Sequence, residues 1–475
     1  MILVVAGVGL HSCHQDRTPS DGKPNVVFIL ADDMGYGDPG CYNKESRIST
    51  PHIDRLAARG IMFTDAHASG AWCVPSRYGL ITGRYPRGME LNPGQRSLIE
   101  QGQETVATLM KRNGYRTACI GKWHLGFDDT DFDNPSTVSE LKGGPVEKGF
   151  DYFFGMHASL DIPPYFYIEN DRAVCSPTGF IDARSSPDAT SEVSGAFYRA
   201  GAISPDFKHE EVLDRFLGKA DTFLTGHVTH HGDKPFFLYF ALTAPHTPWL
   251  PKDEFAGKSG AGEYGDFVMQ VDYLVGRLIA RLDQAGLLEN TIIFFSSDNG
   301  PVWFREDVEK YGHRSTGGLR GKKSDMWEGG SRMPFIVSYP SGFASGAISS
   351  QMIAFTDVMA TLADLVNDED FNQEDFDSRS FLPVLLDPGY DRAVRPDLVV
   401  EKKVYREGAW KFIDGWGQGG IELNYAPHSV EIKDIPGELY DLETDTGEKN
   451  NLYDRYPERV SKMRGDLHEI LGNQE

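Results

Sequence analysis

The feature that most constrains the fold is a series of short apolar runs that each end in polar residues. The runs are NVVFILADD (25–33), YRTACIGKWH (115–124), KPFFLYFAL (234–242), TIIFFSSDNG (291–300) and PFIVSYP (334–340). Runs of this kind are typical of parallel strands that are buried on both faces. We therefore expect these five segments to lie in one large sheet.

Helical segments fall between the runs. Residues 49–60 have Thr50 as a cap, Pro51 in the first turn and Gly60 as a stop, and residues 104–114 also end in glycine. Residues 266–282 place a set of apolar side chains on one helical face: Val271, Leu274, Val275, Leu278 and Leu282. Alternating strands and helices predict an α/β fold with a large mixed, mostly parallel sheet sandwiched by helices.

A chain of 475 residues is too long for one simple core. The pattern predicts a large domain over residues 25–375 and a smaller C-terminal α+β subdomain over residues 376–475. The subdomain has short strand-like pieces, which indicate an antiparallel sheet, and a final amphipathic helix at 457–471. Residues 127–210 lack a clean period and are rich in Pro, Gly, Ser and aromatic residues, so we interpret them as an insertion that shapes a binding site.

Charge and the N-terminal segment limit the partners and the location. Lys plus Arg number 47 against 70 for Asp plus Glu, so the formal charge of −23 argues against nucleic acid as a partner. Residues 1–24 begin with a short apolar run, which we interpret as the remnant of a secretory signal followed by a linker. LHSC loosely resembles a lipoprotein cleavage box, so a lipid anchor on Cys13 is an alternative. We expect a secreted, periplasmic or surface-lipoprotein location, with membrane contact through that anchor alone.

The cysteines do not form a recognisable framework. The five lie at 13, 41, 73, 119 and 175, an odd and widely spaced set without a C-x-x-C pair, so neither a zinc knuckle nor a disulfide framework is indicated. Cys73 opens the segment CVPSRYG, which is the start of a predicted helix. It could be a buried small hydrophobe, half of a disulfide, a nucleophilic thiol or the precursor of a modified residue.

Polar residues gather where the predicted strands end. Ligands of open α/β sheets bind at the carboxyl ends of the strands, so the side chains at these ends should share one rim. The acidic and amide members are Asp32, Asp33, Asp298 and Asn299. Their oxygen atoms would suit a hard cation such as Ca²⁺ or Mg²⁺. Taken one pair at a time, these residues are also ordinary turn and cap residues.

Cationic residues accompany the same rim. Lys122 and His124 end one run and His246 follows another, while Arg77 and Lys323 lie in neighbouring segments. If they share the rim with the metal, they form a pocket for a tetrahedral anion in spite of the negative net charge. Taken singly, each lysine is better explained as a solvated side chain and each histidine as a structural hydrogen-bonding group, and their adjacency in GKWHLG favours the functional interpretation.

These residues stand in motifs that resemble those of the type I, formylglycine-dependent sulfatases. CVPSRYGLITGR is similar to the family signature C-x-P-S-R-x-x-L-x-T-G-R. Further blocks follow in the family's usual order: NVVFILADDMGYGDPGCY, GKWHLG, APHTP, SSDNG and LRGKKSDMWEGGSRMPFIV. The resemblance runs from about residue 24 to about residue 340, and ELYDLETDTGEKNNLY resembles the C-terminal ending of the family.

The resemblance implies an arylsulfatase-like enzyme with the alkaline phosphatase superfold. Cys73 would be oxidised to Cα-formylglycine by a formylglycine-generating enzyme or an anaerobic sulfatase-maturating enzyme, and its hydrated aldehyde would be the nucleophile. Ca²⁺, or Mg²⁺ in its place, would be held by residue 73 together with Asp32, Asp33, Asp298 and Asn299. The implied activity is hydrolysis of a sulfate ester by a sulfuric ester hydrolase.

The resemblance also implies a role for each cation. Arg77 would hold the formylglycine hydroxyl, and Lys122 and Lys323 would bind sulfate oxygens. His124 would act as the base that expels sulfate, and His246 would protonate the leaving alcohol. Lys322 adjoins Lys323, but the family's lysine lies five residues before the Glu of EGG, and counting back from Glu328 gives Lys323.

The substrate is the least constrained part of the prediction. We expect exo-acting hydrolysis on a sulfated polysaccharide, with His313 and Arg314 of the EKYGHRSTGG loop as candidate substrate contacts. Aromatic residues in 152–167 could stack on sugar rings or could simply pack the insertion. The alternatives are a phosphate or phosphonate monoester hydrolase of the same superfold and an unmatured, glycan-binding relative.

Overall fold

The computed structural model describes residues 22–87, 89–91, 96–128, 132 and 140–472. The predictions for residues 1–21, including the lipid anchor on Cys13, lie outside the described residues. Within that described part, no helix combines the length and the apolar character that crossing a membrane requires.

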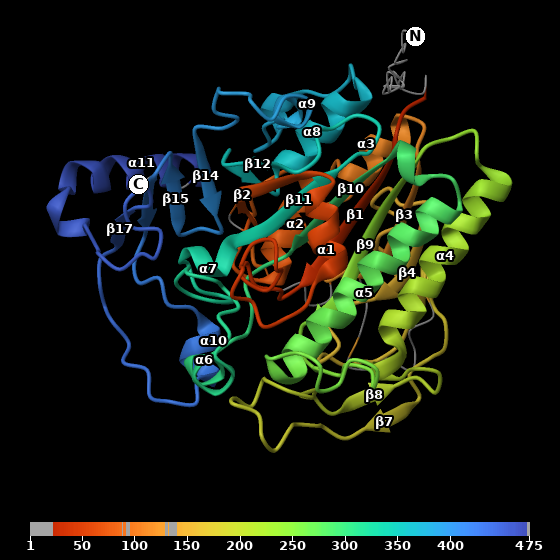
Figure 1. The fold of residues 1–475 in the computed structure, drawn as a ribbon, viewed down its shortest axis with the longest axis horizontal. Helices are drawn as coiled ribbons and strands as arrows, with labels where there is room; N and C mark the ends of the chain where they lie inside the picture. Colours follow the sequence, from red (N-terminus) through yellow and green to blue (C-terminus); the bar gives the residue numbers. More distant parts are fainter. Residues whose placement is uncertain (1–21, 88, 92–95, 129–131, 133–139, 473–475) are drawn as a thin grey trace, which may run out of the picture.

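An eleven-stranded sheet forms the centre of the molecule (Figure 1). Its five middle strands are parallel, and in sheet order they are β10 (Thr291–Ser297), β1 (Asn25–Asp32), β9 (Phe236–Pro245), β3 (Arg116–Lys122) and β4 (Tyr152–Met156). All eight residues of β1 are buried, as expected for a central strand covered on both faces. The remaining strands lie outside these five: β11 (Arg332–Ser338), β2 (Ile61–His67), β12 (Ala347–Ser349) and β13 (Ile353–Ala354) beyond β10, and β5 (Ile168–Glu169) and β6 (Arg172–Ala173) beyond β4.

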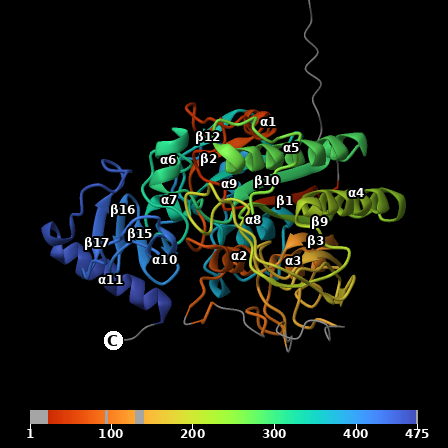
Figure 2. The same ribbon diagram turned by 90° about the horizontal axis from the view of Figure 1, so that it is seen from below.

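Helices cover both faces of this sheet (Figure 2). One face packs against α1 (Pro51–Ala58), α4 (Val212–His230) and α5 (Gly262–Gln284). The opposite face packs against α2 (Cys73–Thr82), α3 (Val106–Arg112), α8 (Asp357–Val366) and α9 (Leu382–Leu386). The predicted α/β sandwich is therefore confirmed, and the five apolar side chains predicted for one face of α5 are all buried.

The orientation of β11 differs from the prediction. PFIVSYP was expected among the parallel strands, but β11 is antiparallel to both β10 and β2. The connection from β10 to β11 contains short helices, α6 (Arg305–Tyr311) and α7 (Glu328–Ser331), instead of a long crossover helix. The chain therefore enters β11 from the end at which it leaves β10, which keeps Lys323 at the carboxyl rim.

The segment 127–210 is not wholly an insertion. It contains β4, which pairs in parallel with β3 and is buried at four of its five positions. The short strands β7 (Gly179–Ile181) and β8 (Gly201–Ile203) form a separate two-stranded sheet beside it. Gly121 of β3 has a φ of 123°, and a Cβ there would meet the carbonyl oxygen of Ala241 at 1.7 Å, so the close approach of β3 to β9 requires glycine.

A four-stranded antiparallel sheet forms the C-terminal subdomain, in blue in Figure 1. Its strands are β14 (Asp397–Val400), β15 (Val404–Glu407), β16 (Trp410–Ile413) and β17 (Glu438–Asp441), and α11 (Pro457–Leu471) packs on it. Phe376, Phe381, Val384 and Leu385 belong to the core of the large domain. The small sheet thus begins at Asp397, about twenty residues after the predicted boundary.

A buried charge network joins the two parts. Asp65 of β2 accepts hydrogen bonds from both terminal nitrogens of Arg406 in β15, at 2.7 and 2.6 Å. Glu328 lies 3.0 Å from Nζ of Lys411 in β16. Asp65, His67 and Glu328 are close enough to hold a metal ion. Arg406 already contacts His67 Nε2 at 2.8 Å, so the protein's own cations neutralise this cluster.

Candidate active site

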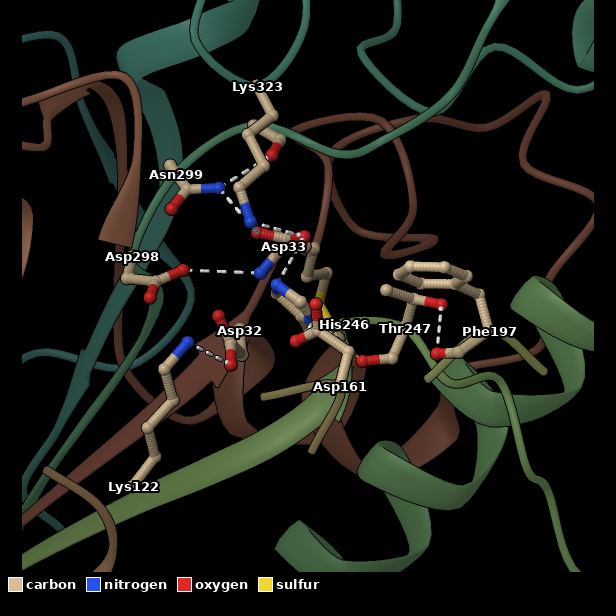
Figure 3. A network of polar contacts seen from close by, with 12 residues as sticks. Asp32, Asp33, Lys122, Asp161, Phe197, His246, Thr247, Asp298, Asn299 and Lys323 are labelled. Atoms are coloured by element: carbon tan, nitrogen blue, oxygen red, sulfur yellow. Dashed lines mark hydrogen bonds and ion pairs between the residues drawn. The ribbon is translucent and has the colours of Figure 1, made fainter. Parts of the chain in front are cut away.

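The predicted acidic residues meet at the carboxyl ends of β1 and β10 (Figure 3). Asp32 ends β1, and Asp298 and Asn299 follow β10. Oδ1 of Asp298 accepts a hydrogen bond from the Asp33 backbone N–H at 3.2 Å. Nδ2 of Asn299 donates to Oδ1 of Asp33 at 2.6 Å. Each of the four is at most 1% exposed, so this is an interior site and not a solvated turn.

Three of the predicted cations pair with these acids. Nζ of Lys122 lies 2.7 Å from Oδ2 of Asp32, and Nζ of Lys323 lies 2.7 and 2.8 Å from the two oxygens of Asp33. Nε of Arg77 donates to Oδ2 of Asp298 at 2.9 Å, and Nη1 donates to the backbone oxygen of Lys122 at 3.0 Å. Residues from five separate segments of the chain therefore converge on one site, and Asp32, Lys122 and Asp298 reach it from strand ends, as the strand-end argument predicts.

The two central carboxyl groups have opposite pKa shifts. Burial raises the pKa of Asp32, but the charges of Lys122, His246, Arg77 and Lys323 outweigh burial and hold that pKa well below its usual range. Burial, together with the neighbouring charge of Asp32, raises the pKa of Asp298 to about 7. The two carboxylates repel each other, and Arg77 offsets part of that repulsion, because its Nη2 lies 3.7 Å from Asp32 and 2.8 Å from Asp298.

The donor set fits a hard divalent cation. Oδ1 of Asp32 and Oδ1 of Asn299 are buried and have no hydrogen-bond partner among the described residues. A buried oxygen without a partner is costly, and oxygen-only ligands are those that Ca²⁺ and Mg²⁺ prefer. Ligand atoms of Asp32, Asp33, Cys73 and His246 also lie within 4.8 Å of one another. The residues present therefore suit the predicted Ca²⁺, or Mg²⁺ in its place.

Cys73 is the first residue of the fully buried helix α2. Pro75 falls in the first turn, where no backbone N–H is needed, and Gly83 ends the helix in the left-handed conformation with a φ of 66°. Burial raises the pKa of the Cys73 thiol even though Lys122 and Lys323 act to lower it. A protonated thiol is a poor nucleophile, and Cys41, Cys73, Cys119 and Cys175 are all free, so neither the thiolate nor the disulfide interpretation is favoured.

Three of the seven described non-glycine residues with a positive φ angle lie at this site. Asp33, His124 and Ser324 have positive φ angles of 65°, 60° and 69°, although none of them is glycine. Such conformations persist where the surrounding structure holds them, and they gather at functional sites. Asp33 and His124 are themselves predicted site residues, and Ser324 directly follows Lys323.

The two predicted histidines present different states. His124 follows β3. Burial and the nearby charges of Lys122 and Arg77 hold the pKa of His124 well below the usual value. Its buried Nδ1 has no hydrogen-bond partner in the described chain. His124 is therefore neutral and able to accept a proton. Nδ1 of His246 donates to the backbone oxygen of Thr247 at 2.6 Å, and Nε2 lies 3.7 Å from Oδ2 of Asp33. That geometry directs Nε2 of His246 into the site.

The C-terminal subdomain holds the loop that carries Lys323. The backbone N–H of Met326 donates to the oxygen of Gly417 at 2.7 Å, and the N–H of Gly419 donates to Oδ1 of Asp325 at 2.7 Å. A Cβ on Gly419 would meet the backbone oxygen of Ser324 at 1.8 Å. The position of Lys323 therefore depends on close packing against residues beyond the large domain.

The structure does not support His313 as a substrate contact. Its side chain is fully buried, with Nε2 2.8 Å from Oδ1 of Asp38, and its backbone oxygen accepts a hydrogen bond from Trp303 at 3.0 Å. His313 thus holds its loop in place through internal hydrogen bonds. A polar residue in a glycine-rich loop can have this structural role as readily as a role in substrate binding. Arg314 is exposed, and its contact with substrate stays a prediction.

Sequence reasoning did not identify Asp161 as a site residue. Its carboxylate is 8% exposed, and Oδ1 lies 3.8 Å from Nδ1 of His246 (Figure 3). The sequence nevertheless contains a pattern that points to Asp161. The apolar run of β4, residues 152–156, is followed by HASLD, just as the other buried strands are followed by polar residues. Because the rest of residues 127–210 has no regular apolar periodicity, the whole segment is interpreted as an insertion and this strand is not recognised.

Acidification is expected to destabilise the protein partly through His157, which precedes Asp161 on the same segment. Burial lowers the pKa of His157 from 6.5 to about 4, and its ring stacks on Phe132 with the centroids 4.5 Å apart. The unfolded chain binds this proton from about pH 6.5 downward, whereas the folded chain does not, so stability is lost as the pH falls, by about 3 kcal/mol at pH 4.

Thermal unfolding from pH 7 to pH 4 tests this expectation. His157→Phe keeps an aromatic ring in place but cannot titrate, so its melting temperature should fall less on acidification than that of the wild type. The variant also loses the hydrogen bond to Pro164, which lowers its melting temperature by the same amount at every pH. The difference in pH dependence between the two proteins is therefore not affected. Identical pH dependence of the two proteins would show that His157 does not contribute.

Comparisons with known proteins identify the family of this chain. The sequence profile of the family described as Sulfatase matches residues 24–368. An N-acetylgalactosamine-6-O-sulfatase from Bacteroides thetaiotaomicron is 34% identical, over 97% of this chain and 96% of the relative. Human arylsulfatase A is 32% identical, over 90% of this chain and 83% of the relative.

Solved structures share the fold. One from Bacteroides thetaiotaomicron, reported under the metabolism of multiple glycosaminoglycans, superposes with a TM-score of 0.81 at 31% identity, covering 95% of this chain and 99% of that one. A phosphonate monoester hydrolase of Agrobacterium radiobacter superposes with a TM-score of 0.60 at 16% identity, covering 94% of this chain and 95% of that one. The second likeness concerns the fold alone.

Proposed function

This chain belongs to the sulfatase family and is a sulfuric ester hydrolase, and we propose that it removes a 6-O-sulfate from a terminal N-acetylgalactosamine residue of a sulfated glycan. The observation that carries the enzymatic part is the convergence of Cys73, four oxygen ligands and five cationic or histidine side chains on one buried rim. The sugar is inferred from the relatives, since three of them are named as N-acetylgalactosamine 6-sulfatases.

The proposed reaction needs a nucleophile better than a buried thiol. We propose that Cys73 is converted to formylglycine by a formylglycine-generating enzyme or an anaerobic sulfatase-maturating enzyme. The hydrated aldehyde supplies one hydroxyl that can attack sulfur and a second hydroxyl whose deprotonation allows sulfate to leave. The start of α2 favours negative charge on these oxygens, because its first backbone N–H groups have no partner within the helix.

The metal would be held by Asp32, Asp33, Asp298 and Asn299 together with residue 73. Bound there, Ca²⁺ would supply positive charge that polarises the sulfate oxygens and favours the ionised hydroxyl. Asp32 and Asp33 already carry charged partners, Lys122 and Lys323, so the same side chains would hold the cation and orient the two lysines.

The cationic side chains would bind and orient the sulfate group. Lys122 and Lys323 would donate charge-assisted hydrogen bonds to its oxygens, where such bonds are strongest. Arg77 is fully buried and fixed by Asp298, which suits it to hold the hydroxyl of residue 73 in one position. These groups need no rearrangement when charge develops on the sulfate oxygens.

The two histidines would move protons. His124 is neutral and would take the proton from the second hydroxyl of residue 73. His246 would give a proton from Nε2 to the leaving alcohol oxygen, because Nδ1 is committed to the Thr247 carbonyl. The alternative of a phosphate or phosphonate monoester hydrolase has no comparable support, since that likeness is one of fold alone.

Sulfate release from defined sugars tests the proposed function. The matured protein should release sulfate from N-acetylgalactosamine 6-sulfate at least about tenfold faster than from N-acetylglucosamine 6-sulfate or N-acetylgalactosamine 4-sulfate. Turnover of a non-reducing terminal residue and not of an internal one would support exo action. If none of these sugars is hydrolysed while an aryl sulfate is, the carbohydrate assignment is rejected.

The location is also a proposal. The short apolar N-terminal run is consistent with a secreted, periplasmic or surface-lipoprotein enzyme, in which Cys13 would carry the lipid. A large glycan would be met outside the cytoplasm in any of these locations.

A further inference from the structure

A segment of the insertion lies directly against the residues that follow His246. Oγ1 of Thr247 donates to the backbone oxygen of Gly195 at 3.0 Å. It also lies 3.4 Å from the backbone oxygen of Phe197 (Figure 3). The backbone N–H of Trp249 donates to the Gly195 oxygen at 2.7 Å. Residues 195–199 are therefore fixed relative to the histidine that would protonate the leaving alcohol.

Arg199 is tied to Asp161 within this arrangement. Its backbone N–H donates to the Asp161 oxygen at 3.2 Å, and its Nη1 contacts both that oxygen, at 3.4 Å, and Oδ2 of the carboxylate. The hydroxyl of Tyr165 donates to the backbone oxygens of Arg199 and Asp161, at 2.7 and 3.1 Å. The two residues thus form one rigid unit.

The other oxygen of Asp161 faces the imidazole ring of His246. Oδ1 is buried, has no hydrogen-bond partner in the described part of the chain, and lies 3.8 Å from Nδ1 of His246. One carboxylate therefore separates the guanidinium of Arg199 from the imidazole of His246. Arg199 is thereby held, through Asp161, beside the histidine that would meet the leaving alcohol, which makes it a candidate contact for the sugar ring.

Arg199 has unused hydrogen-bond donors at an accessible position. Its side chain is 45% exposed, and its guanidinium carbon lies 5.2 Å from the centre of the Phe197 ring. Among the contacts of the described residues, Nε and Nη2 make no hydrogen bond, so a fork of N–H groups is available. Asp161 already balances the positive charge of Arg199, which suits the pair to neutral oxygen acceptors more than to an additional anion.

We propose that Arg199 is a substrate-specificity residue that donates hydrogen bonds to a hydroxyl or acetamido oxygen of the sugar ring carrying the sulfate, with Asp161 as its anchor. This inference rests on the proposed function and names a contact on the alcohol side of the ester. It concerns recognition of the sugar, since Arg199 lies outside the cluster that binds sulfate.

Kinetics of Arg199→Met with two substrates test the proposal. One substrate is N-acetylgalactosamine 6-sulfate, and the other is para-nitrophenyl sulfate, which has no sugar hydroxyl. The ratio of kcat/KM for the sugar to kcat/KM for the aryl ester should fall about 10- to 100-fold, the effect of losing a hydrogen bond to a charged donor. Inhibition by inorganic sulfate should not change, whereas inhibition by free N-acetylgalactosamine should weaken.

Arg215→Met is the matched control. Arg215 is 40% exposed, lies 3.0 Å from Asp206 and sits over the Tyr167 ring at 5.0 Å, but its carboxylate partner has no contact with His246 among the described residues. The ratio of kcat/KM for the sugar to kcat/KM for the aryl ester should stay at the wild-type value in Arg215→Met. An unchanged ratio in Arg199→Met, or an equal loss in both variants, overturns the proposal. A matured wild type that hydrolyses neither substrate instead contradicts the proposed function, and this inference falls with it.

Discussion

Replacing Cys73 with alanine is expected to lower the rate of sulfate release by at least about 10⁴-fold, the scale seen when an enzyme loses its nucleophile. Residue 73 is the first residue of a buried helix, and the charged groups near it are Lys122, Lys323, Asp32 and Asp298. A methyl group at this position leaves the sulfate pocket intact but provides no attacking oxygen. The protein should still fold, because alanine is smaller than cysteine and is a better helix former. Sulfate release under single-turnover conditions measures the loss.

Cys175→Ala is the matched control for this experiment. Cys175 is a free, half-buried cysteine in the insertion and has no contact with the proposed catalytic residues among the described part of the chain. Its rate should equal that of the wild type. Activity that survives Cys73→Ala would exclude residue 73 as the source of the nucleophile.

Replacing Asp32 with asparagine is expected to lower sulfate release by about 10²- to 10⁴-fold and to weaken calcium binding, because a metal ion supplies several kcal/mol of charge stabilisation in reactions of this type. The substitution preserves shape but removes the charge from a carboxylate whose Oδ1 has no hydrogen-bond partner in the described chain. It also leaves Lys122, 2.7 Å from Oδ2, without its counter-charge. Titrating calcium into chelator-treated protein, with sulfate release as the readout, measures both effects.

Asp272→Asn provides the comparison for Asp32→Asn. Asp272 is also buried, and burial raises its pKa to about 7. It accepts hydrogen bonds from the backbone of His52 and Ile53 on α1 and lies outside the site. Its calcium response and rate should match those of the wild type. Full activity after chelation, or equal behaviour of the two variants, would contradict a metal at the rim.

Strand-end logic predicted most of the site because it depends on topology alone. Asp32, Lys122, His246 and Asp298 each end or follow a parallel strand, and parallel strands place those positions at one edge whatever the details of packing. Lys323 does not follow a parallel strand. It reaches the rim because β11 runs antiparallel to β10, a consequence of a connection that apolar periodicity does not describe.

The substrate side was less predictable for a physical reason. His313 and Asp161 are both polar residues in loops. The sequence does not reveal which of them makes a purely structural hydrogen bond and which lies beside the active site. His313 is fully buried against Asp38, whereas Asp161 lies beside His246 and anchors Arg199. These contacts join residues 275, 85 and 38 positions apart, and such long-range pairs are set by tertiary packing.

The mass of the tryptic peptide Gly60–Arg77, determined on the same preparation in which sulfate release is measured, tests the central claim most directly. We expect catalytic activity to rise in proportion to the fraction of this peptide in which the cysteine mass is replaced by that of formylglycine. Full activity in a preparation whose peptide carries unmodified Cys73 throughout would contradict it.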